Sequence, residues 1–275
     1  MSGKLFLVAT PIGNLEDITI RAINVLKEVD IIAAEDTRHT LKLLNHFDIK
    51  KPLISYYKEI EKNKSEILIE KLLEGKNIAL VSDAGTPAIS DPGEEIVKEC
   101  IKNNIEINPI PGACAFVNAL ICSGLSTREF VFVGFLPTNN KEKKEKIKEI
   151  GNIDKTIILY ESPHRIKETL EKILEIIGNR KVVLAREITK IHEEFIRGNI
   201  EEVLLEIEDK KGEFVILIEG SEKKDDEKAF LNNLSLEEHY NYYLNKNYNN
   251  KEIIKQIAKD RQKTKNEIYQ YFINK

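Results

Sequence analysis

The sequence predicts an α/β protein in which two α/β domains precede a small helical appendage. Short apolar runs alternate with apolar stripes at helical spacing through residues 1–125, and a second such series occupies residues 126–221. A charged stretch and capped helices fill residues 222–275. Alternating strands and helices imply a mostly parallel sheet with helices on both faces, so we expect a parallel five-stranded sheet in the first domain.

The composition is typical of a soluble globular protein. Of the 275 residues, 41% are hydrophobic and 32% are charged. We expect no signal peptide, because residues 1–7 lack a basic start and a long apolar core. No apolar run approaches the ~20 residues of a membrane span. Three cysteines without CxxC spacing predict neither a disulfide framework nor a zinc site, and they fit a reducing cytoplasm.

The first domain is predicted to contain five strand–helix pairs. We expect Asp17 to be the N-cap of the first helix, and Gly75 and Gly124 to end the third and fifth. The strands are predicted at residues 4–9, 31–34, 52–55, 78–81 and 105–110, and the helices at 18–29, 41–47, 65–73, 94–101 and 115–122.

One connection in the first domain is unusually long. Residues 80–93 read LVSDAGTPAISDPG, in which a buried strand stops at Ser82 and a helix begins after Gly93. An ordinary strand-to-helix connection takes about 2–6 residues, whereas this one takes roughly 11. Its Gly, Pro, Asp, Ser and Thr residues favour turns and caps that leave backbone groups exposed. We therefore expect this loop to hold a small ligand.

The other unusual loops of the first domain also follow strands. TPIGN, EDTRHT, SYYK and PGACA each come directly after a predicted strand. Because the carboxyl ends of parallel strands meet at one edge of a sheet, all five loops are expected there, where open α/β sheets bind ligands. The cluster Glu35, Asp36, Arg38 and His39 lies at the same edge.

The second domain and the tail give weaker signals. Strands are predicted at residues 130–136, 156–160, 181–186 and 214–218, a helix at 166–177, and either helix or strand at 200–207. Residues 141–149 are almost wholly charged and predict a solvated helix face. Residues 221–228 predict a charged linker. Capping boxes at Ser235/Glu238 and Thr264/Glu267 predict tail helices; residues 253–261 and 266–272 are either a helix-turn-helix or two packed helices.

Several common sites are disfavoured by their missing motifs. The chain has no G-x-G-x-x-G, no P-loop and no G-x-S-x-G, and its histidines lack metal-ligand spacing. Three histidines in loop-end motifs, His39, His164 and His192, are functional candidates. With these sites disfavoured, the remaining interpretation is a ligand held by backbone groups between two α/β units. A zwitterionic, adenine-bearing molecule would suit such a site.

The loop motifs together resemble a known family. VATPIGNLEDIT, AAEDTRHT, LVSDAGTPAISDPG, PIPGACA, GFLP, YESPHR, REITK and GEFVILIEG occur in this order. In order and spacing they resemble the ribosomal RNA small-subunit methyltransferase I family of the tetrapyrrole methylase superfamily, over about residues 4–220. Two departures from the wider superfamily, TPIG in place of a glycine-rich first loop and Cys114 in place of Ser or Thr, fit the ribosomal RNA branch.

The resemblance implies a fold, a reaction and a set of partners. The second domain would have a mixed sheet, and the protein would be a homodimer that binds S-adenosylmethionine. The implied reaction is 2′-O-methylation of a cytidine ribose in the decoding region of 16S rRNA, on the small ribosomal subunit and without a metal. The implied cofactor-binding residues are Pro11, Asp83, Ala84, Gly85, Thr86, Ala88, Ile89, Ala113, Cys114, Ala115, Tyr160, Arg186, Glu213 and Phe214.

A ribose hydroxyl is a poor nucleophile until it loses its proton, so a general base is expected. Our hypothesis is that one of four groups orients or deprotonates this hydroxyl: Glu35, Asp36, His39 or Lys190. Three cationic or imidazole side chains, Arg38, His164 and Arg165, would hold phosphate. Each could instead form a structural ion pair or cap, and for Asp36 a cap is an equally good interpretation.

The charge distribution leaves the role of the tail open. Residues 246–275 contain eight Lys and Arg against three Asp and Glu, a net charge of +5. Because the whole chain has a net charge of −4, residues 1–245 have a net charge of −9. A basic tail is either a footprint for a polyanion or a result of general lysine enrichment. Two alternatives to the rRNA reaction are a corrin or porphyrin methylase on the same fold and a non-catalytic ribosome assembly factor.

Overall fold

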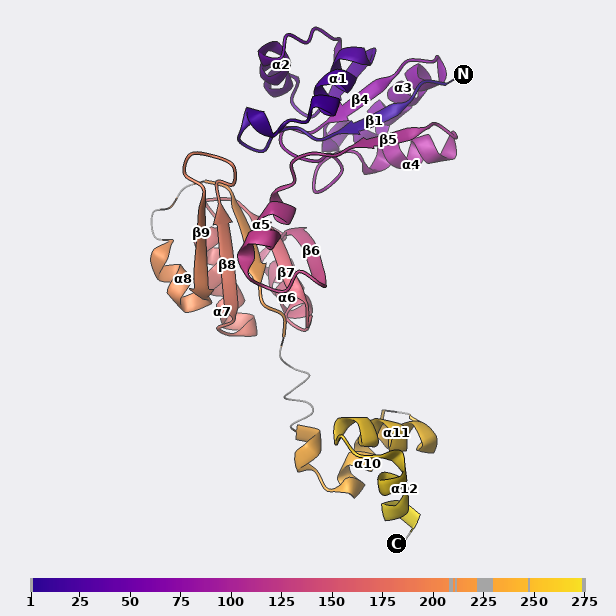
Figure 1. Cartoon of the computed structure of the whole chain (residues 1–275), viewed down its shortest axis with the longest axis vertical. Helices are drawn as coiled ribbons and strands as arrows, with labels where there is room; N and C mark the ends of the chain where they lie inside the picture. The colour runs from indigo at the N-terminus through magenta and orange to yellow at the C-terminus, as the bar shows by residue number, and fades with distance from the viewer. Residues whose placement is uncertain (1, 208–209, 211, 222–229, 247, 274–275) are drawn as a thin grey trace. The chain divides into compact units, whose positions relative to one another are not determined.

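The computed structural model of the chain describes residues 2–207, 210, 212–221, 230–246 and 248–273. They form two compact units (Figure 1). The first contains Met1–Lys148 and Thr156–Glu219 and carries both sheets, whereas the second contains Glu149–Lys155 and Gly220–Lys275. The division into domains at residues 125 and 221 stays a prediction.

The first sheet is five-stranded and entirely parallel, as predicted. Its strands are β1 (Leu5–Val8), β2 (Ile31–Ala34), β3 (Leu53–Ser55), β4 (Ile78–Val81) and β5 (Ile107–Ile110), in the order β3-β2-β4-β1-β5. Central β4 is fully buried, and its Leu80 lies opposite Leu7 of β1 and Ala33 of β2. The loop after β4 therefore emerges between the loops that follow β1 and β2.

Helices cover both faces of this sheet (Figure 1). On one face lie α1 (Ile20–Glu28) and α2 (Thr37–His46), and on the other α3 (Glu61–Leu73) and α4 (Glu94–Lys102). Successive residues of β4 face opposite ways. Leu80 belongs to the core under α3 and α4, and Val81 to the core under α1 and α2. The apolar run in β4 reflects burial on both faces.

The predicted cap of the first helix is wrong. Asp17 lies inside a short 3₁₀ helix, η1 (Leu15–Asp17), which Asn14 caps. The chain then extends through Ile18, and Thr19 caps α1 by accepting the N–H of Ala22 on its hydroxyl at 3.1 Å. The extra 3₁₀ turn moves the start of α1 past the position where the sequence suggested it.

Two other helices begin earlier than predicted. Asp36 caps α2, so Thr37 to Thr40 form its first turn and are not loop. Helix α3 begins at Glu61 after η2 (Lys58–Ile60). Their first turns are polar, which hides the apolar periodicity by which a helix start is recognised. Conversely, β5 begins two residues later than predicted, at Ile107.

The second sheet is mixed, as the resemblance implied. It consists of β6 (Phe130–Phe135), β7 (Thr156–Glu161), β8 (Lys181–Arg186), β9 (Glu194–Asn199) and β10 (Phe214–Ile218), in the order β6-β7-β10-β8-β9. Strand β6 is parallel to β7, whereas β10 is antiparallel to both β7 and β8. The sequence did not predict β9, an edge strand with mixed polar and apolar residues. Residues 200–206 resolve as helix α8 (Ile200–Glu206).

Helix α5 (Ala115–Ser123) connects the two sheets (Figure 1). It follows β5 of the first sheet, yet Ala119 and Leu120 pack on Val215 and Leu217 of the second. Two further helices, α6 (Asn140–Ile150) and α7 (Ile166–Ile177), belong to the second α/β series. Most of α6 is exposed as predicted, but Lys143 is buried and pairs with Glu168 at 3.0 Å.

The tail is a helical unit. It contains α10 (Leu236–Leu244), α11 (Asn250–Asp260) and α12 (Lys265–Ile273), around a core that includes Ile253, Ile257 and Ile268. Both predicted capping boxes are present: Ser235 with Glu238, and Thr264 with Glu267. The predicted linker at 221–228 lies outside the described residues apart from Ser221. Among the described residues, no helix is both long and apolar enough to cross a membrane.

Candidate active site

The loop after β4 pairs with the loop after β1. The Thr10 N–H donates to the Gly85 carbonyl at 2.8 Å, and the Gly85 N–H donates back at 3.1 Å. Gly85 has φ +85°, and a Cβ there would lie 3.1 Å from the Ile12 side chain. Glycine is needed because this φ disfavours a side chain and the neighbouring loop is close. Two loops far apart in sequence thus form one backbone surface.

The second half of this loop has a strained backbone. Ala88 and Ser90 both have positive φ values, 65° and 67°, which non-glycine residues rarely adopt. Gly93 has φ +146°, and a Cβ there would lie 2.8 Å from the Ala88 Cβ. Strain of this kind persists only where the surroundings fix the conformation. The loop is therefore held in one shape.

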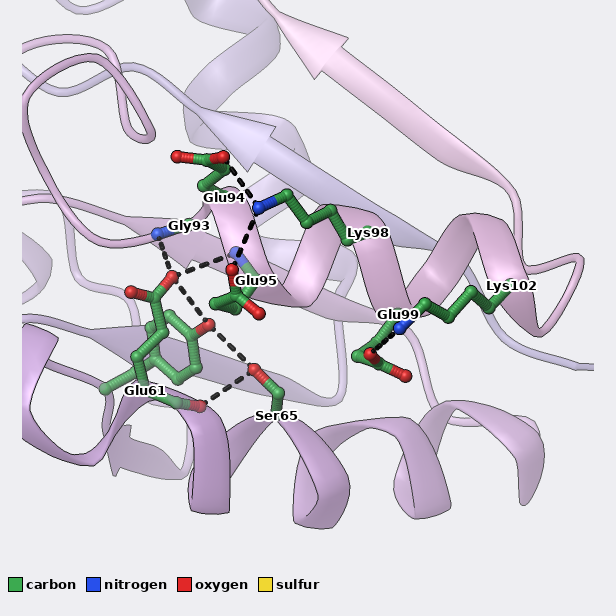
Figure 2. A network of polar contacts seen from close by, with 9 residues as sticks. Glu61, Ser65, Gly93, Glu94, Glu95, Lys98, Glu99 and Lys102 are labelled. Atoms are coloured by element: carbon green, nitrogen blue, oxygen red, sulfur yellow. Dashed lines mark hydrogen bonds and ion pairs between the residues drawn. The ribbon is translucent and has the colours of Figure 1, made fainter.

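Glu61 anchors the end of the loop (Figure 2). Its Oε1 accepts the N–H of Gly93 at 2.8 Å and that of Glu95 at 3.1 Å, at the start of α4. The Tyr56 hydroxyl donates to the same oxygen at 3.2 Å and bonds the Ser65 hydroxyl at 2.9 Å. A carboxylate at a helix N-terminus satisfies free N–H groups and favours the helix dipole. Glu61 thus ties α3 to the end of the loop after β4.

The second sheet contributes an aromatic and polar wall. The Tyr160 hydroxyl accepts the N–H of Phe116 at 3.3 Å, and the Tyr160 ring lies 5.6 Å from that of Phe135. Beside it, the buried Glu161 carboxylate accepts the Thr169 hydroxyl at 2.7 Å and the Ser162 N–H at 2.8 Å. Burial raises the pKa of both Tyr160 and Cys114. Hydrogen bonds to α5, to α7 and to the loop after β7 thus hold Tyr160 and Glu161 in place.

A cavity of about 390 Å³ lies among these elements. Ligand pockets commonly have volumes of this order. Many implied cofactor-binding residues line it: Ala84, Gly85, Thr86, Ile89, Cys114, Ala115, Tyr160, Glu213 and Phe214. Other implied members do not: Pro11, Asp83, Ala88, Ala113 and Arg186. Each of these five is next in sequence to a residue that lines the cavity.

The cavity has further lining residues that the sequence reasoning missed. They are Ile12, Ser90, Asp91, Phe135, Glu161, Ser162, Pro163, Ala185, Ile188 and Val215. Phe135 and Glu161 to Pro163 belong to the motifs GFLP and YESPHR, so extending the assignment to whole motifs would have found them. Val215 likewise lies in the motif GEFVILIEG. Ala185 carried no signal, because apolar strand residues look alike whether they face a cavity or a core.

Three carboxyl groups gather at the edge of the first sheet. The Asp83 carboxylate accepts the N–H of Asp36 at 2.9 Å, which brings the loops after β4 and β2 together. Burial, together with the negative charge of Asp83, raises the pKa of Glu35. Burial and the charges of Glu35 and Asp83 raise the pKa of Asp91 to about 7. Because Asp91 lines the cavity, the charge on the cavity wall can change near neutral pH.

The first turn of α2 holds the rest of the EDTRHT motif. Asp36 caps the helix by accepting the N–H of Arg38 at 2.8 Å, and its carboxylate also pairs with the Arg38 guanidinium. This pairing lowers the pKa of Asp36. The Arg38 side chain is 89% exposed, and His39 is also exposed. None of the four residues Glu35, Asp36, Arg38 and His39 lines the cavity itself.

Lys190, which follows β8, lies against the loop after β1. A Cβ at Gly13 would lie 2.5 Å from the Lys190 Cγ, so the two segments are in close contact. The Lys190 ammonium pairs with Glu187 and Glu213, each at 3.0 Å. Burial lowers the pKa of Lys190, but these two carboxylates raise it overall. Nearby, Arg186 pairs with Glu194 at 3.2 Å.

His164 and Arg165 follow β7 but differ in surroundings. His164 is exposed. The Arg165 guanidinium donates to the Leu136 carbonyl at 3.1 Å and lies 3.5 Å from Glu161. Within the part of the chain that the structure describes, no three His, Cys, Asp or Glu side chains gather where they could hold a metal ion.

Comparison with known proteins places the chain in a family. The family model for tetrapyrrole (corrin/porphyrin) methylases matches residues 4–204. The chain belongs to the tetrapyrrole methylase family. Within it the chain belongs with proteins named ribosomal RNA small subunit methyltransferase I. One, from Halalkalibacterium halodurans, is 51% identical over 98% of this chain and 94% of its own length; another, from Bacillus subtilis, is 49% identical over 97% and 93%.

Solved structures of the family share the fold at low identity. A diphthine synthase superposes with a TM-score of 0.62 at 16% identity, over 80% of this chain and 90% of its own. A uroporphyrin-III C-methyltransferase from Thermus thermophilus, complexed with S-adenosylhomocysteine, gives a TM-score of 0.56 at 17% identity, over 78% and 97%. Both confirm the predicted fold class.

Proposed function

We propose that this chain transfers a methyl group from S-adenosylmethionine to the 2′-hydroxyl of a cytidine ribose in the decoding region of 16S rRNA. The proposal rests mainly on the cavity between the loop after β4 and the wall formed by β7 and β10. This cavity occurs in a chain that is 51% identical, over almost its whole length, to a protein named ribosomal RNA small subunit methyltransferase I.

The cavity suits S-adenosylmethionine in size and charge. Its volume of about 390 Å³ falls in the range of small-molecule sites. A family structure was solved with S-adenosylhomocysteine, the demethylated form. When bound, the cofactor supplies a methyl group on a positively charged sulfur. The Asp91 carboxylate can balance a positive charge, and the Thr10–Gly85 backbone bridge fixes the floor on which the ligand would lie.

The four candidate bases differ in how well their surroundings suit them to accept a proton. Asp36 is bound to Arg38 and caps a helix, and its lowered pKa makes it a weak base. Lys190 has a raised pKa, so its ammonium suits orientation of the acceptor better than proton removal. Glu35 has a raised pKa and lies beside Asp83, and His39 is exposed. We infer that Glu35 or His39 accepts the proton.

The phosphate-binding residues separate into two groups. Arg38 and His164 are exposed and can reach a substrate backbone. Arg165 is engaged with Glu161 and the Leu136 carbonyl. We propose that Arg165 positions the YESPHR loop while Arg38 and His164 contact RNA.

The remaining expectations about partners are part of the same proposal. A substrate on the small ribosomal subunit implies action in the cytoplasm, which the three free cysteines fit. We also propose a homodimer, as the family resemblance implies. Sedimentation of the purified chain would test the oligomeric state.

The test is methyl transfer to competing acceptors. Small subunits from a strain lacking the enzyme, and separately uroporphyrinogen, are incubated with the protein and labelled S-adenosylmethionine. We expect label only in 16S rRNA, at a ribose 2′-oxygen, so that the adjacent phosphodiester bond becomes resistant to alkaline cleavage. Label in the tetrapyrrole would favour a corrin or porphyrin methylase. Cofactor binding without transfer to either acceptor would favour an assembly factor.

A further inference from the structure

The tail contains a groove that the proposed reaction does not use. It lies between α11 and α12 and has a volume of about 390 Å³. The residues that line it are Lys251, Glu252, Ile254, Lys255, Lys265, Asn266 and Tyr269. The groove belongs wholly to the helical tail and is separate from the cavity of the first unit.

Three lysines give this groove its charge. Lys251 and Lys255 lie one turn apart on α11 and are exposed, as is Lys265 at the start of α12. Within the described residues, none of these three ammonium groups makes an ion pair or hydrogen bond. The acidic member, Glu252, accepts the Asn249 N–H in a capping box, which holds it at the N-terminus of α11. The groove therefore presents positive charge to solvent.

The groove also has an aromatic ring and an amide. The Tyr269 side chain is 51% exposed, and Asn266 lies one turn before it on α12. Exposed aromatic rings stack on unpaired bases, and amides bond base edges. Lysines that track a backbone beside a stacking ring are typical of single-stranded nucleic acid sites.

Helix α11, on one side of the groove, is held against α10 by buried polar contacts, and α12, on the other side, packs on the same apolar core through Ile268. Asp260 at the end of α11 accepts the Tyr243 hydroxyl and lies 3.3 Å from the His239 ring nitrogen. Arg261 donates to the other His239 nitrogen at 3.1 Å and to the Leu231 carbonyl at 3.3 Å. Satisfied buried networks of this kind fix one packing arrangement. A preformed groove loses little entropy when it binds.

We propose that the groove between α11 and α12 binds a single-stranded segment of the substrate RNA, with phosphates on Lys251, Lys255 and Lys265 and a base on Tyr269. This inference rests on the proposed function, which supplies an RNA substrate. It gives the tail a role in capturing the ribosomal subunit, apart from the chemistry in the first unit. Residues 1–245 carry a net charge of −9, opposite to that of the groove. This acidic remainder of the chain is the one other occupant that the test must distinguish.

The experiment compares two triple variants of the full chain. One carries Lys251→Gln, Lys255→Gln and Lys265→Gln; the control carries Lys27→Gln, Lys50→Gln and Lys62→Gln, which are exposed lysines on the first unit. Binding to unmethylated small subunits is measured at several salt concentrations. The tail variant should bind about tenfold or more weakly, with a salt slope smaller by about 2, because about 0.7 counterion is released per single-strand phosphate.

Two further measurements keep the outcomes separate. Tyr269→Leu should weaken subunit binding several-fold and leave the salt slope unchanged, since stacking releases no counterions. All variants should bind S-adenosylhomocysteine like the wild type. Equal subunit affinity of the two triple variants would overturn the inference. If, in that case, the tail variant also has a larger radius of gyration than the wild type, the groove binds the acidic remainder of the chain instead.

The proposed function fails in a different way. If the wild type transfers no methyl group to small subunits while the tail lysines still govern subunit binding, the reaction is wrong and the groove assignment stands. If the wild type methylates the subunit and the tail variant binds it normally, the reaction stands and the groove assignment is wrong.

Discussion

The two sides of the candidate site are built in different ways. The side proposed to hold the methyl donor, around the loop after β4, is shaped by backbone: a two-way bridge at Thr10 and Gly85, positive φ values at Ala88 and Ser90, and the anchor at Glu61. The side proposed to meet the acceptor consists of exposed or half-buried side chains such as Arg38, His39 and Lys190. Substitutions around the loop after β4 should therefore affect stability and cofactor binding, whereas those on the other side should affect the rate of methyl transfer or the binding of RNA.

The largest effect is expected at Glu35. Glu35→Gln keeps the shape of the side chain but cannot accept a proton, so single-turnover methyl transfer should fall about a hundredfold, as for loss of a general base. Cofactor affinity should stay near the wild-type value. The control is Glu28→Gln, an exposed residue at the end of α1. Normal rates for Glu35→Gln, with a slow His39→Ala, would move the role of base to His39.

Gly93 tests the rigidity of the donor side. Gly93→Ala places a Cβ 2.8 Å from the Ala88 Cβ at φ +146°. We expect the free energy of unfolding to fall by about 2 kcal/mol and cofactor binding to weaken, because the strained loop must shift. Gly124→Ala has φ +80° and open space around it, so it reports the backbone cost alone. Chemical denaturation and calorimetry measure both effects, and equal losses in the two variants would contradict a packing role.

Glu61 tests the anchor of the same loop. Glu61→Ala leaves the N–H groups of Gly93 and Glu95 and the Tyr56 hydroxyl without their common acceptor. The expected loss is about 1 to 2 kcal/mol of unfolding free energy, since half-buried donors are left unpaired. Glu99→Ala removes an exposed pair with Lys102, shown in Figure 2 on the same helix, and should change stability by less than about 0.5 kcal/mol.

The smallest effect is a pH dependence at Asp91. Its pKa is raised from 3.8 to about 7, with Glu35, Asp83, Ser82 and Tyr160 as its interacting groups. The folded state thus holds a proton that the unfolded state loses near pH 4, and stability falls as pH rises from about 4 to 7. Asp91→Asn should match the wild type near pH 4 and melt about 2 °C higher at pH 8. Asp17→Asn, an exposed control, should not; an unchanged pH profile for Asp91→Asn would contradict the charge cluster.

The sequence was most informative where one feature of the chain forces one structure. Central strand β4 is apolar on both faces. The polar loop after it is much longer than an ordinary strand-to-helix connection requires. Glycine at positions 85 and 93 marked backbone that only glycine adopts easily. These local signals predicted the fold class, which the structure confirms, and singled out the loop after β4 without any knowledge of contacts.

The sequence was least informative where the deciding partner is distant along the chain. Asp17 looked like a helix cap until the η1 turn moved the cap to Thr19. Edge strand β9 escaped notice because it lacks a clean alternation. Asp91 looked like one more turn residue, and its raised pKa arises from Glu35 and Asp83 on neighbouring loops.

By itself the sequence determined the parallel first sheet and the positions of the motif loops, because periodicity and turn chemistry act over a few residues. The order and spacing of the motifs pointed to the family by resemblance. Only the tertiary structure decided which members of those motifs face the cavity, which carboxyl groups lie together, and that Glu61 holds the end of the loop after β4. Distances between residues thirty or more positions apart depend on how helices pack on the sheets, and no local pattern encodes them.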